Sequence, residues 1–186
     1  MVLLMRKDMK ASVYIATSLD GFIARKNGAL DWLPGADGAA NDSTEDFGYQ
    51  AFMDGVDHLV MGRNSFELVL SFGAWPYEKP VTILSGSMKS LPPGLPDSVD
   101  LMNCSPQHLF QELEQRGRKS LYIDGGKTIQ GFLSNRLIDE LTLTRVPILL
   151  GEGIPLFGPL GKDIKLEHLE TTSFPNGFVQ SRYRVP

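Results

Sequence analysis

The order of strand-like and helix-like segments constrains this chain most. Short runs rich in β-branched and aromatic residues, at 11–16, 58–62, 81–85 and 120–124, read as buried strands, and amphipathic segments lie between them. Beyond about residue 134 only strand-like segments follow. Alternating strands and helices are typical of a parallel sheet, and a strand-only end adds antiparallel neighbours. The order predicts an α/β fold with a mostly parallel sheet and an antiparallel edge.

Four helices are expected between the strands. A start of the capping-box type spans Asp42 to Glu45, and the apolar residues within 49–56 recur at helical spacing. Asn64 is the expected N-cap of the second helix, and Ser105 followed by Pro106 begins the third. The fourth helix is expected over 128–134. Each helix therefore has its own sequence signal.

The last part of the chain predicts an antiparallel hairpin. Strands are expected over 139–150, 164–172 and 177–185. The last two alternate in polarity and are joined by "SFPNG". Its Asn-Gly pair is a strong hairpin signal because both residues tolerate positive φ.

Composition narrows the class of protein. The 186 residues predict one domain over 1–186, in which residues 1–10 form a frayed leader. The net charge of -4 and the absence of a basic run argue against nucleic-acid and membrane partners. Cys104 is the only cysteine, so no intrachain disulfide can form and a cytoplasmic location is expected. No histidine or cysteine spacing suggests a metal site.

Glycines stand where strands end and helices begin. "LVMGRNSFE" contains Gly62, "YIDGGKTI" contains Gly125 and Gly126, and "ILSGS" contains Gly86. Helix N-termini attract phosphate, and ligands of open α/β sheets bind beyond the carboxyl ends of strands. Neither a Rossmann nor a Walker A motif is present. Two interpretations remain open, ordinary βα turns and a nucleotide site of another kind.

An ordered set of motifs resembles a known superfamily. "SLDGFIA", "MGRNSFE", "TILSGS", "DGGKTIQGFL" and "DELTLTRVPILLGEGIPLF" occur in the order seen in dihydrofolate-reductase-like proteins. The branch they resemble most is the reductase (RibD C-terminal) domain of riboflavin biosynthesis. This resemblance implies a three-layer αβα fold, NADPH as cofactor, a homodimer, and hydride transfer to a small nitrogen heterocycle or its precursor, as in 5-amino-6-(5-phosphoribosylamino)uracil reductase or dihydrofolate reductase.

The same resemblance assigns cofactor residues in four groups. The first lines and covers the nicotinamide ring, the second holds phosphate at a helix start, the third flanks the adenosine ribose and the fourth forms the pyrophosphate turn. In that order the groups are Ala16, Thr17, Ser18, Leu19, Asp20 and Gly21; Gly62, Arg63, Asn64 and Ser65; Ser85, Gly86 and Ser87; and Asp124, Gly125, Gly126, Lys127, Thr128 and Ile129. The resemblance also implies a cis peptide bond between Gly125 and Gly126.

The catalytic residues expected from the resemblance are Asp46, Asp20 and Thr144. Asp46 falls where folate reductases keep their active-site carboxylate, and a buried carboxylate there would have a raised pKa and act as an acid. The alternative is that Asp46 is a first-turn acid that stabilises a helix N-terminus. Asp20 is expected to face the substrate, and Thr144 supplies a strand hydroxyl near it. Lys79 stands near the position where folate reductases bind the folate tail with an arginine.

Three functions remain open at this point. The first is an NADPH-dependent oxidoreductase acting on a riboflavin-pathway pyrimidine-like or pterin-like substrate. The second is a non-catalytic module that binds NADPH or a flavin-like metabolite. The third is a structural domain that binds no nucleotide.

Overall fold

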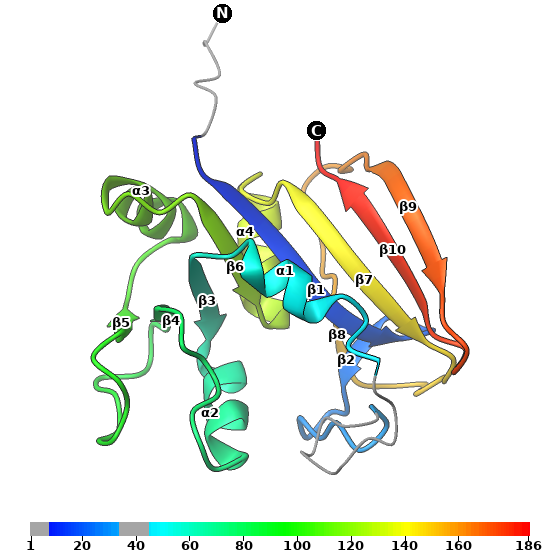
Figure 1. Cartoon of the computed structure of the whole chain (residues 1–186), viewed down its shortest axis with the longest axis horizontal. Helices are drawn as coiled ribbons and strands as arrows, with labels where there is room; N and C mark the ends of the chain where they lie inside the picture. The colour runs from blue at the N-terminus through cyan, green and yellow to red at the C-terminus, as the bar shows by residue number, and fades with distance from the viewer. Residues whose placement is uncertain (1–7, 34–44) are drawn as a thin grey trace, which may run out of the picture.

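The computed structural model describes residues 8–33 and 45–186, and its centre is one eight-stranded sheet (Figure 1). The strands are ordered β5-β4-β3-β6-β1-β7-β10-β9 across it, and β2 and β8 form a separate pair. The strand bounds are β1 Lys10–Ser18, β2 Phe22–Ala24, β3 His58–Gly62, β4 Val81–Leu84, β5 Val99–Met102, β6 Ser120–Asp124, β7 Glu140–Val146, β8 Ile154–Pro155, β9 Glu167–Ser173 and β10 Val179–Arg184.

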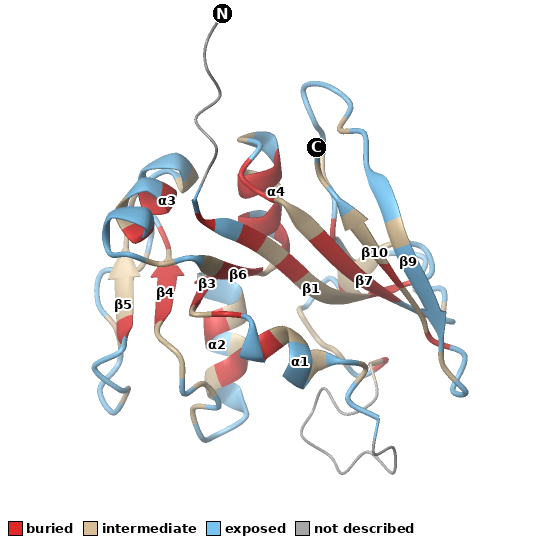
Figure 2. Cartoon of the chain, turned by 45° about the horizontal axis from the view of Figure 1, so that its top comes forward, coloured by how far each residue is buried: buried red, intermediate tan, exposed pale blue. Residues whose placement is uncertain are grey.

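Helices cover both faces of the sheet, which confirms the predicted three-layer αβα arrangement. They are α1 (Tyr49–Asp54), α2 (Arg63–Ser71), α3 (Pro106–Gln115) and α4 (Gly126–Ser134). The helices α1 and α2 pack on one face through Met53 and Phe66, and α3 and α4 pack on the other through Leu109 and Phe132. Figure 2 shows the buried faces of these helices turned toward the sheet.

The strand directions confirm the predicted mixed sheet. From β5 to β7 every neighbouring pair is parallel, whereas β10 pairs antiparallel with both β7 and β9. The turn between β9 and β10 contains Asn176, whose side chain accepts a hydrogen bond from the Phe178 N–H at 3.1 Å, and Gly177 at φ 85°. The hairpin therefore forms at the Asn-Gly pair.

The central strands are apolar on both faces because helices cover both. Val60 of β3 and Ile123 of β6 are fully buried on the face that α3 and α4 cover. Leu59 and Met61 of β3 are fully buried on the face that α1 and α2 cover. Burying each such side chain stabilises the fold by about 1.5–3 kcal/mol. This rigid centre places the carboxyl ends of β3 and β6 beside each other.

Two predicted helix starts are wrong. The helix α1 begins at Tyr49, after Phe47 and Gly48 turn the chain at φ 56° and 82°, and residues 42–44 of the expected start lie outside the described residues. Asn64 does not cap α2, because Gly62 stays extended in register with β4 and the helix begins at the next residue, Arg63. The start of α3 is as predicted, with the Ser105 hydroxyl accepting from the His108 N–H.

Candidate nucleotide-binding and active site

The three glycine corners lie side by side. They follow β4, β3 and β6, which are neighbours in the sheet. From β3 the chain passes through α2 to β4 on one side, and from β6 it passes through α4 to β7 on the other side, with α2 and α4 on opposite faces. The carboxyl ends of β3 and β6 are therefore a topological switch point, where open α/β sheets bind their ligands.

The corners at Gly62 and Gly125 fit into each other. A Cβ atom on Gly62 would lie 2.7 Å from Thr128 Oγ1 of α4, and one on Gly125 would lie 2.5 Å from Ser65 Oγ of α2. Gly125 also has φ 89° and ψ 136°, a conformation that L side chains rarely adopt. Glycine is needed at both corners because each receives a hydroxyl side chain from the opposite helix.

The predicted cis bond between Gly125 and Gly126 is wrong, since no peptide bond in residues 8–33 and 45–186 is cis. The corner is turned by the positive φ of Gly125, which glycine adopts without the steric cost that Cβ imposes. The cofactor assignment therefore rests on the other features of these corners.

Arg63 and Ser87, which are distant in sequence, meet at the outer end of this switch point. The Arg63 Nη1 group lies 3.4 Å from Ser87 Oγ, and its Nε donates to Glu67 at 2.7 Å. The Ser85 hydroxyl accepts from the N–H groups of Ser87 and Met88, which shapes the turn after β4. The resemblance assigned Arg63 to a phosphate and Ser87 to the adenosine ribose. The structure places both side chains where they could contact the same part of a ligand.

The predicted nicotinamide loop is bound to a distant loop through Asp20. Ser18 Oγ donates to Asp20 Oδ1 at 2.6 Å, and the Asp20 carboxylate accepts from the Gly151 and Leu150 N–H groups at 2.8 and 3.2 Å. Hydrogen bonds from Ser18 and from those N–H groups hold the pKa of Asp20 below its usual value. Asp20 is thus an ionised group that fastens two loops.

A cavity of about 310 Å³ lies beside this loop. Leu143, Arg145, Leu156 and Phe157 line it from β7 and the segment after β8. The remaining lining residues are Thr17, Leu19, Asp20 and Gly21, all assigned to the nicotinamide end by the resemblance.

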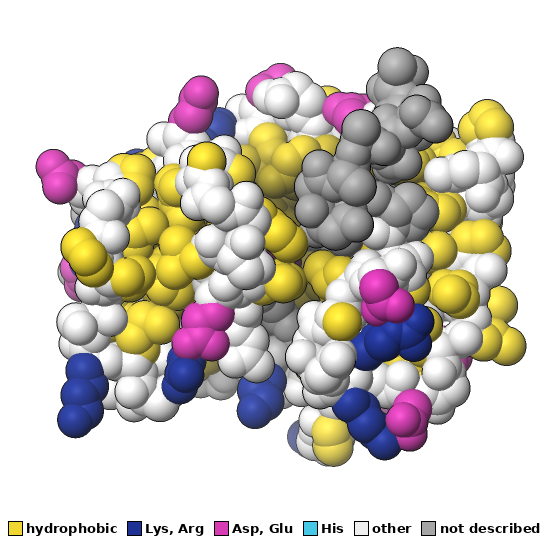
Figure 3. Space-filling model, turned by 90° about the horizontal axis from the view of Figure 1, so that it is seen from below, with side chains coloured by type: hydrophobic (Ala, Val, Ile, Leu, Met, Phe, Trp, Pro, Cys, Tyr) yellow, Lys and Arg dark blue, Asp and Glu magenta, His cyan; other side chains and the backbone are white. Residues whose placement is uncertain are grey.

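Aromatic side chains gather where α1 crosses the sheet, and we call Tyr14, Tyr49, Phe52 and Tyr122 the aromatic face. The Tyr14 ring lies 5.5 Å from that of Tyr49 and 5.0 Å from that of Phe52, and Phe52 and Tyr122 are 5.1 Å apart. Tyr122 is buried, whereas the other three are partly exposed. Figure 3 looks onto the carboxyl ends of the parallel strands and shows an apolar hollow there.

Gln180 joins the aromatic face to Thr144. Its Nε2 group lies 3.0 Å from Thr144 Oγ1 and 3.1 Å from both Tyr14 Oη and the Phe47 carbonyl oxygen. Tyr14 Oη also donates to that carbonyl at 2.8 Å. Sequence reasoning missed Tyr14 and Gln180, because only the register that pairs Gln180 with Thr144 brings β10 to this site.

Two carboxyl groups differ in their suitability as acids. Asp46 is exposed and accepts from the Gly48 and Gln50 N–H groups at 2.9 and 3.0 Å, which lower its pKa. The expected raised pKa is therefore wrong, and the geometry matches the helix-capping alternative. Asp124, at the end of β6, has a pKa raised by burial, which outweighs hydrogen bonds from the Gly125 N–H, Ser65 and Tyr122.

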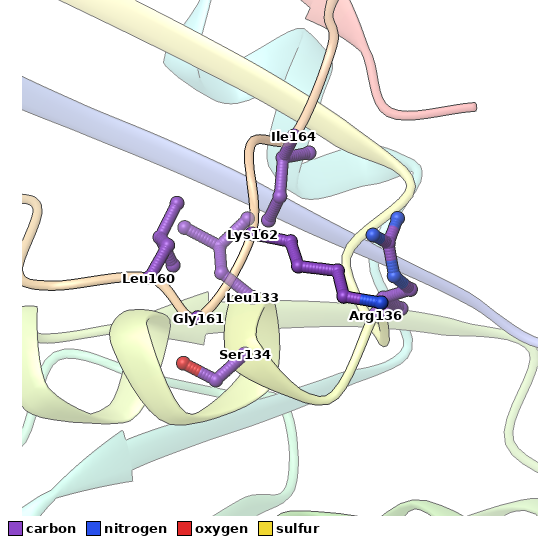
Figure 4. Close-up of a pocket in the computed structure, with 7 residues that line it drawn as sticks. All are labelled: Leu133, Ser134, Arg136, Leu160, Gly161, Lys162 and Ile164. Atoms are coloured by element: carbon purple, nitrogen blue, oxygen red, sulfur yellow. The ribbon is translucent and has the colours of Figure 1, made fainter.

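A second cavity, of about 250 Å³, lies at the carboxyl end of α4, away from the glycine corners (Figure 4). Arg136 and Lys162 line it together with apolar side chains. In residues 8–33 and 45–186 no helix is long and apolar enough to span a bilayer. The same residues contain no cluster of metal-ligating side chains.

The sheet order, the flanking helices and the corners at the switch point give an α/β fold of the dihydrofolate-reductase type. Residues 10–180 match the family model of the RibD C-terminal domain. The chain belongs to this family, as its resemblance implied.

Individual relatives agree with this assignment. A putative riboflavin biosynthesis protein from Shewanella sp. PV-4 is 45% identical with a TM-score of 0.88, covering 96% of this chain and 99% of that one. The uncharacterized protein YwjB of Bacillus subtilis (strain 168) is 33% identical over 170 residues, 90% of this chain and 93% of YwjB. Dihydrofolate reductase from Enterococcus faecalis, solved with NADP(H), shares the fold at 17% identity and a TM-score of 0.63, covering 96% of each chain.

Proposed function

We propose that the chain is an NADPH-dependent oxidoreductase that transfers a hydride to a small nitrogen heterocycle or its precursor in riboflavin-type metabolism. The interlocked corners of Gly62 and Gly125 at the switch point support this proposal most directly. Family membership and the reductase fold support the reaction class. A dinucleotide would cross this point, with its adenosine end toward β4 and its nicotinamide end toward β1.

The residues present fit a dinucleotide. The N-cap residues of α2 and α4 are Gly62 and Gly125, which have no side chain to cap the helix. The first-turn N–H groups of both helices therefore suit phosphate oxygens. Arg63 and Ser87 together suit the 2′-phosphate that distinguishes NADPH from NADH. When bound, NADPH supplies the hydride.

The protein side chains would position the acceptor and donate a proton to it. The aromatic face offers ring surfaces for stacking, and the Thr144 and Tyr14 hydroxyls and the Gln180 amide fix its edge. Among the described carboxyl groups whose pKa is shifted, Asp124 is the one in which it is raised. We assign the proton to the Asp124 carboxyl, because a raised pKa retains a proton closer to neutral pH.

A non-catalytic NADPH-binding module is the second candidate. The observation that favours it is the exposure and lowered pKa of Asp46, the residue expected to donate the proton. The two candidates predict the same nucleotide binding and differ only in turnover.

Thermal unfolding with each nucleotide and NADPH oxidation with an acceptor panel test both candidates. A ligand that binds only the native state raises the melting temperature, and NADPH should do so more than NADH at equal concentration. The absence of a shift with either nucleotide at about millimolar levels, near the weak limit of specific binding, would refute both candidates. If NADPH binds but none of the acceptors causes its oxidation, the non-catalytic binding module remains as the supported candidate.

A further inference from the structure

The charges around the aromatic face are unusual for a site that binds a phosphorylated acceptor. Burial raises the pKa of Tyr14, and the carboxylates of Asp46 and Glu45 raise it further. Burial and the Asp124 carboxylate raise the pKa of Tyr49 in the same way. The carboxylates of Asp46, Glu45 and Asp124 therefore lie close enough to act on these two tyrosines.

Two cations in the described part of the chain, Lys79 near the end of α1 and Arg182 on β10, have partners of their own. Lys79 donates to the carbonyl oxygen of Val56, just after α1. Arg182, two residues beyond Gln180 on the same side of β10, pairs with Glu170 at 2.7 Å and Glu140 at 3.3 Å. Lys79, at the position compared with the folate-tail arginine, therefore directs its ammonium group at a backbone carbonyl oxygen.

On the aromatic face itself, the polar groups that the structure describes are neutral or acidic. The polar edge of the aromatic face consists of the Thr144 hydroxyl, the Tyr14 hydroxyl and the Gln180 amide. Asp124 is either a carboxylate, which repels anions, or a protonated carboxyl, which is uncharged.

We propose that the acceptor is a flat, uncharged or cationic heterocycle that bears no phosphate or carboxylate. Stacking on Tyr14, Tyr49 and Phe52 supplies its affinity, and the surrounding carboxylates exclude anionic derivatives. The inference rests on the proposed function, whose family resemblance alone would have suggested a phosphorylated acceptor. The face would instead serve a reaction that follows loss of the phosphate or that never involves one.

Matched pairs of commercial compounds test this directly. Riboflavin is compared with FMN, and 6-hydroxymethylpterin with folate, by fluorescence titration of the NADP⁺-saturated protein at low salt. The uncharged member of each pair should bind at least about tenfold more tightly, and added salt should narrow the difference because it screens repulsion. Equal or tighter binding of FMN or folate would overturn the inference, as would failure of all four to bind at about millimolar concentration.

A pair of variants isolates the charge. Tyr49→Arg and Tyr49→Gln lose the same ring, but only the first adds a cation beside Tyr14, whose ring is 5.5 Å away. Relative to Tyr49→Gln, Tyr49→Arg should shift the preference toward FMN by about tenfold. Gln50→Arg places the same charge on the neighbouring exposed position of α1 and should shift it far less. An equal shift in Gln50→Arg would show that overall charge, rather than this face, sets the preference, which also overturns the inference.

The result can be separated from the proposed function. NADPH binding is measured independently by thermal shift, and where it fails the four titrations are repeated without nucleotide. The same order of affinities then supports an uncharged ligand for a protein that is not an NADPH reductase. If NADPH binds but FMN and folate bind more tightly than their uncharged partners, the reductase proposal stands and the inference of an uncharged acceptor is overturned.

Discussion

His58 should make the stability of this fold depend on pH in a defined window. The side chain is 2% exposed at the start of β3, and its Nε2 lies 2.8 Å from Thr82 Oγ1, which in turn donates to Asp100. Its Nδ1 atom is buried and has no hydrogen-bond partner in the described part of the chain. Protonation would therefore place an N–H group and a charge where nothing receives them.

The size of the effect follows from the pKa. Burial, with help from the Arg118 charge, lowers the pKa of His58 from 6.5 to about 4, although Asp100 and Asp57 oppose this. Between those values the unfolded chain binds more protons than the native one, so stability is full above pH 6.5 and falls as pH falls. The loss attributable to His58 should reach about 2.5 kcal/mol at pH 4.5.

Urea unfolding of the wild type and of His58→Gln from pH 7.5 to 4.5 measures this. Gln keeps an N–H donor for Thr82 but does not titrate. Other titrating groups are common to both proteins, so the difference between their unfolding free energies isolates His58. That difference should shift in favour of the variant by about 2.5 kcal/mol as pH falls. A difference that stays constant with pH would refute the reasoning.

Three further predictions concern the site. Gly62→Ala should cost about 1–3 kcal/mol, because its Cβ would meet Thr128 Oγ1 at 2.7 Å, and adding Thr128→Ala should restore part of it, as urea unfolding of the single and double variants would show. Arg63→Gln should reduce the preference for NADPH over NADH by about tenfold or more in thermal-shift titrations, and an unchanged ratio would remove Arg63 from the 2′-phosphate site. Asp124→Asn should lower kcat by about 10²-fold or more with NADPH affinity retained, whereas Asp46→Asn should change stability and leave kcat within a few-fold; the opposite result would return the proton to Asp46.

Much of the fold could be predicted from local pattern. The strands at β1, β3, β4 and β6, the cap at Ser105 and the Asn-Gly hairpin depend on neighbouring residues, whose periodicity and backbone preferences the sequence displays. The helix starts expected at Asp42 to Glu45 and at Asn64 were wrong for a physical reason. Several neighbouring residues could cap each helix. The positive φ angles of Phe47 and Gly48 decided where α1 begins, and the pairing of Gly62 with β4 decided where α2 begins.

Part of the candidate site could likewise be predicted from local sequence, and part depends on the tertiary structure. Glycines at strand ends are visible in sequence, and Gly62, Gly86 and Gly125 indicated the three corners. At Gly62 and Gly125 the structure shows why glycine is needed, because a Cβ would meet a hydroxyl of the opposite helix. The contact of Arg63 with Ser87, and of Ser65 with the Gly125 corner, depends on the order of β4, β3 and β6. No local signal indicated that Gln180 faces Thr144 or that Asp20 fastens a loop.

By itself the sequence determined the kinds of element, the corners and the family, because these depend on residue type and short spacing. Only the tertiary structure decided which carboxyl groups could hold a proton. Asp46 and Asp124 are chemically alike, yet hydrogen bonds from backbone N–H groups lower the pKa of the exposed Asp46, while burial at the end of β6 raises that of Asp124. Burial and hydrogen bonding depend on what packs around a group, and the chain brings those neighbours together only when it folds.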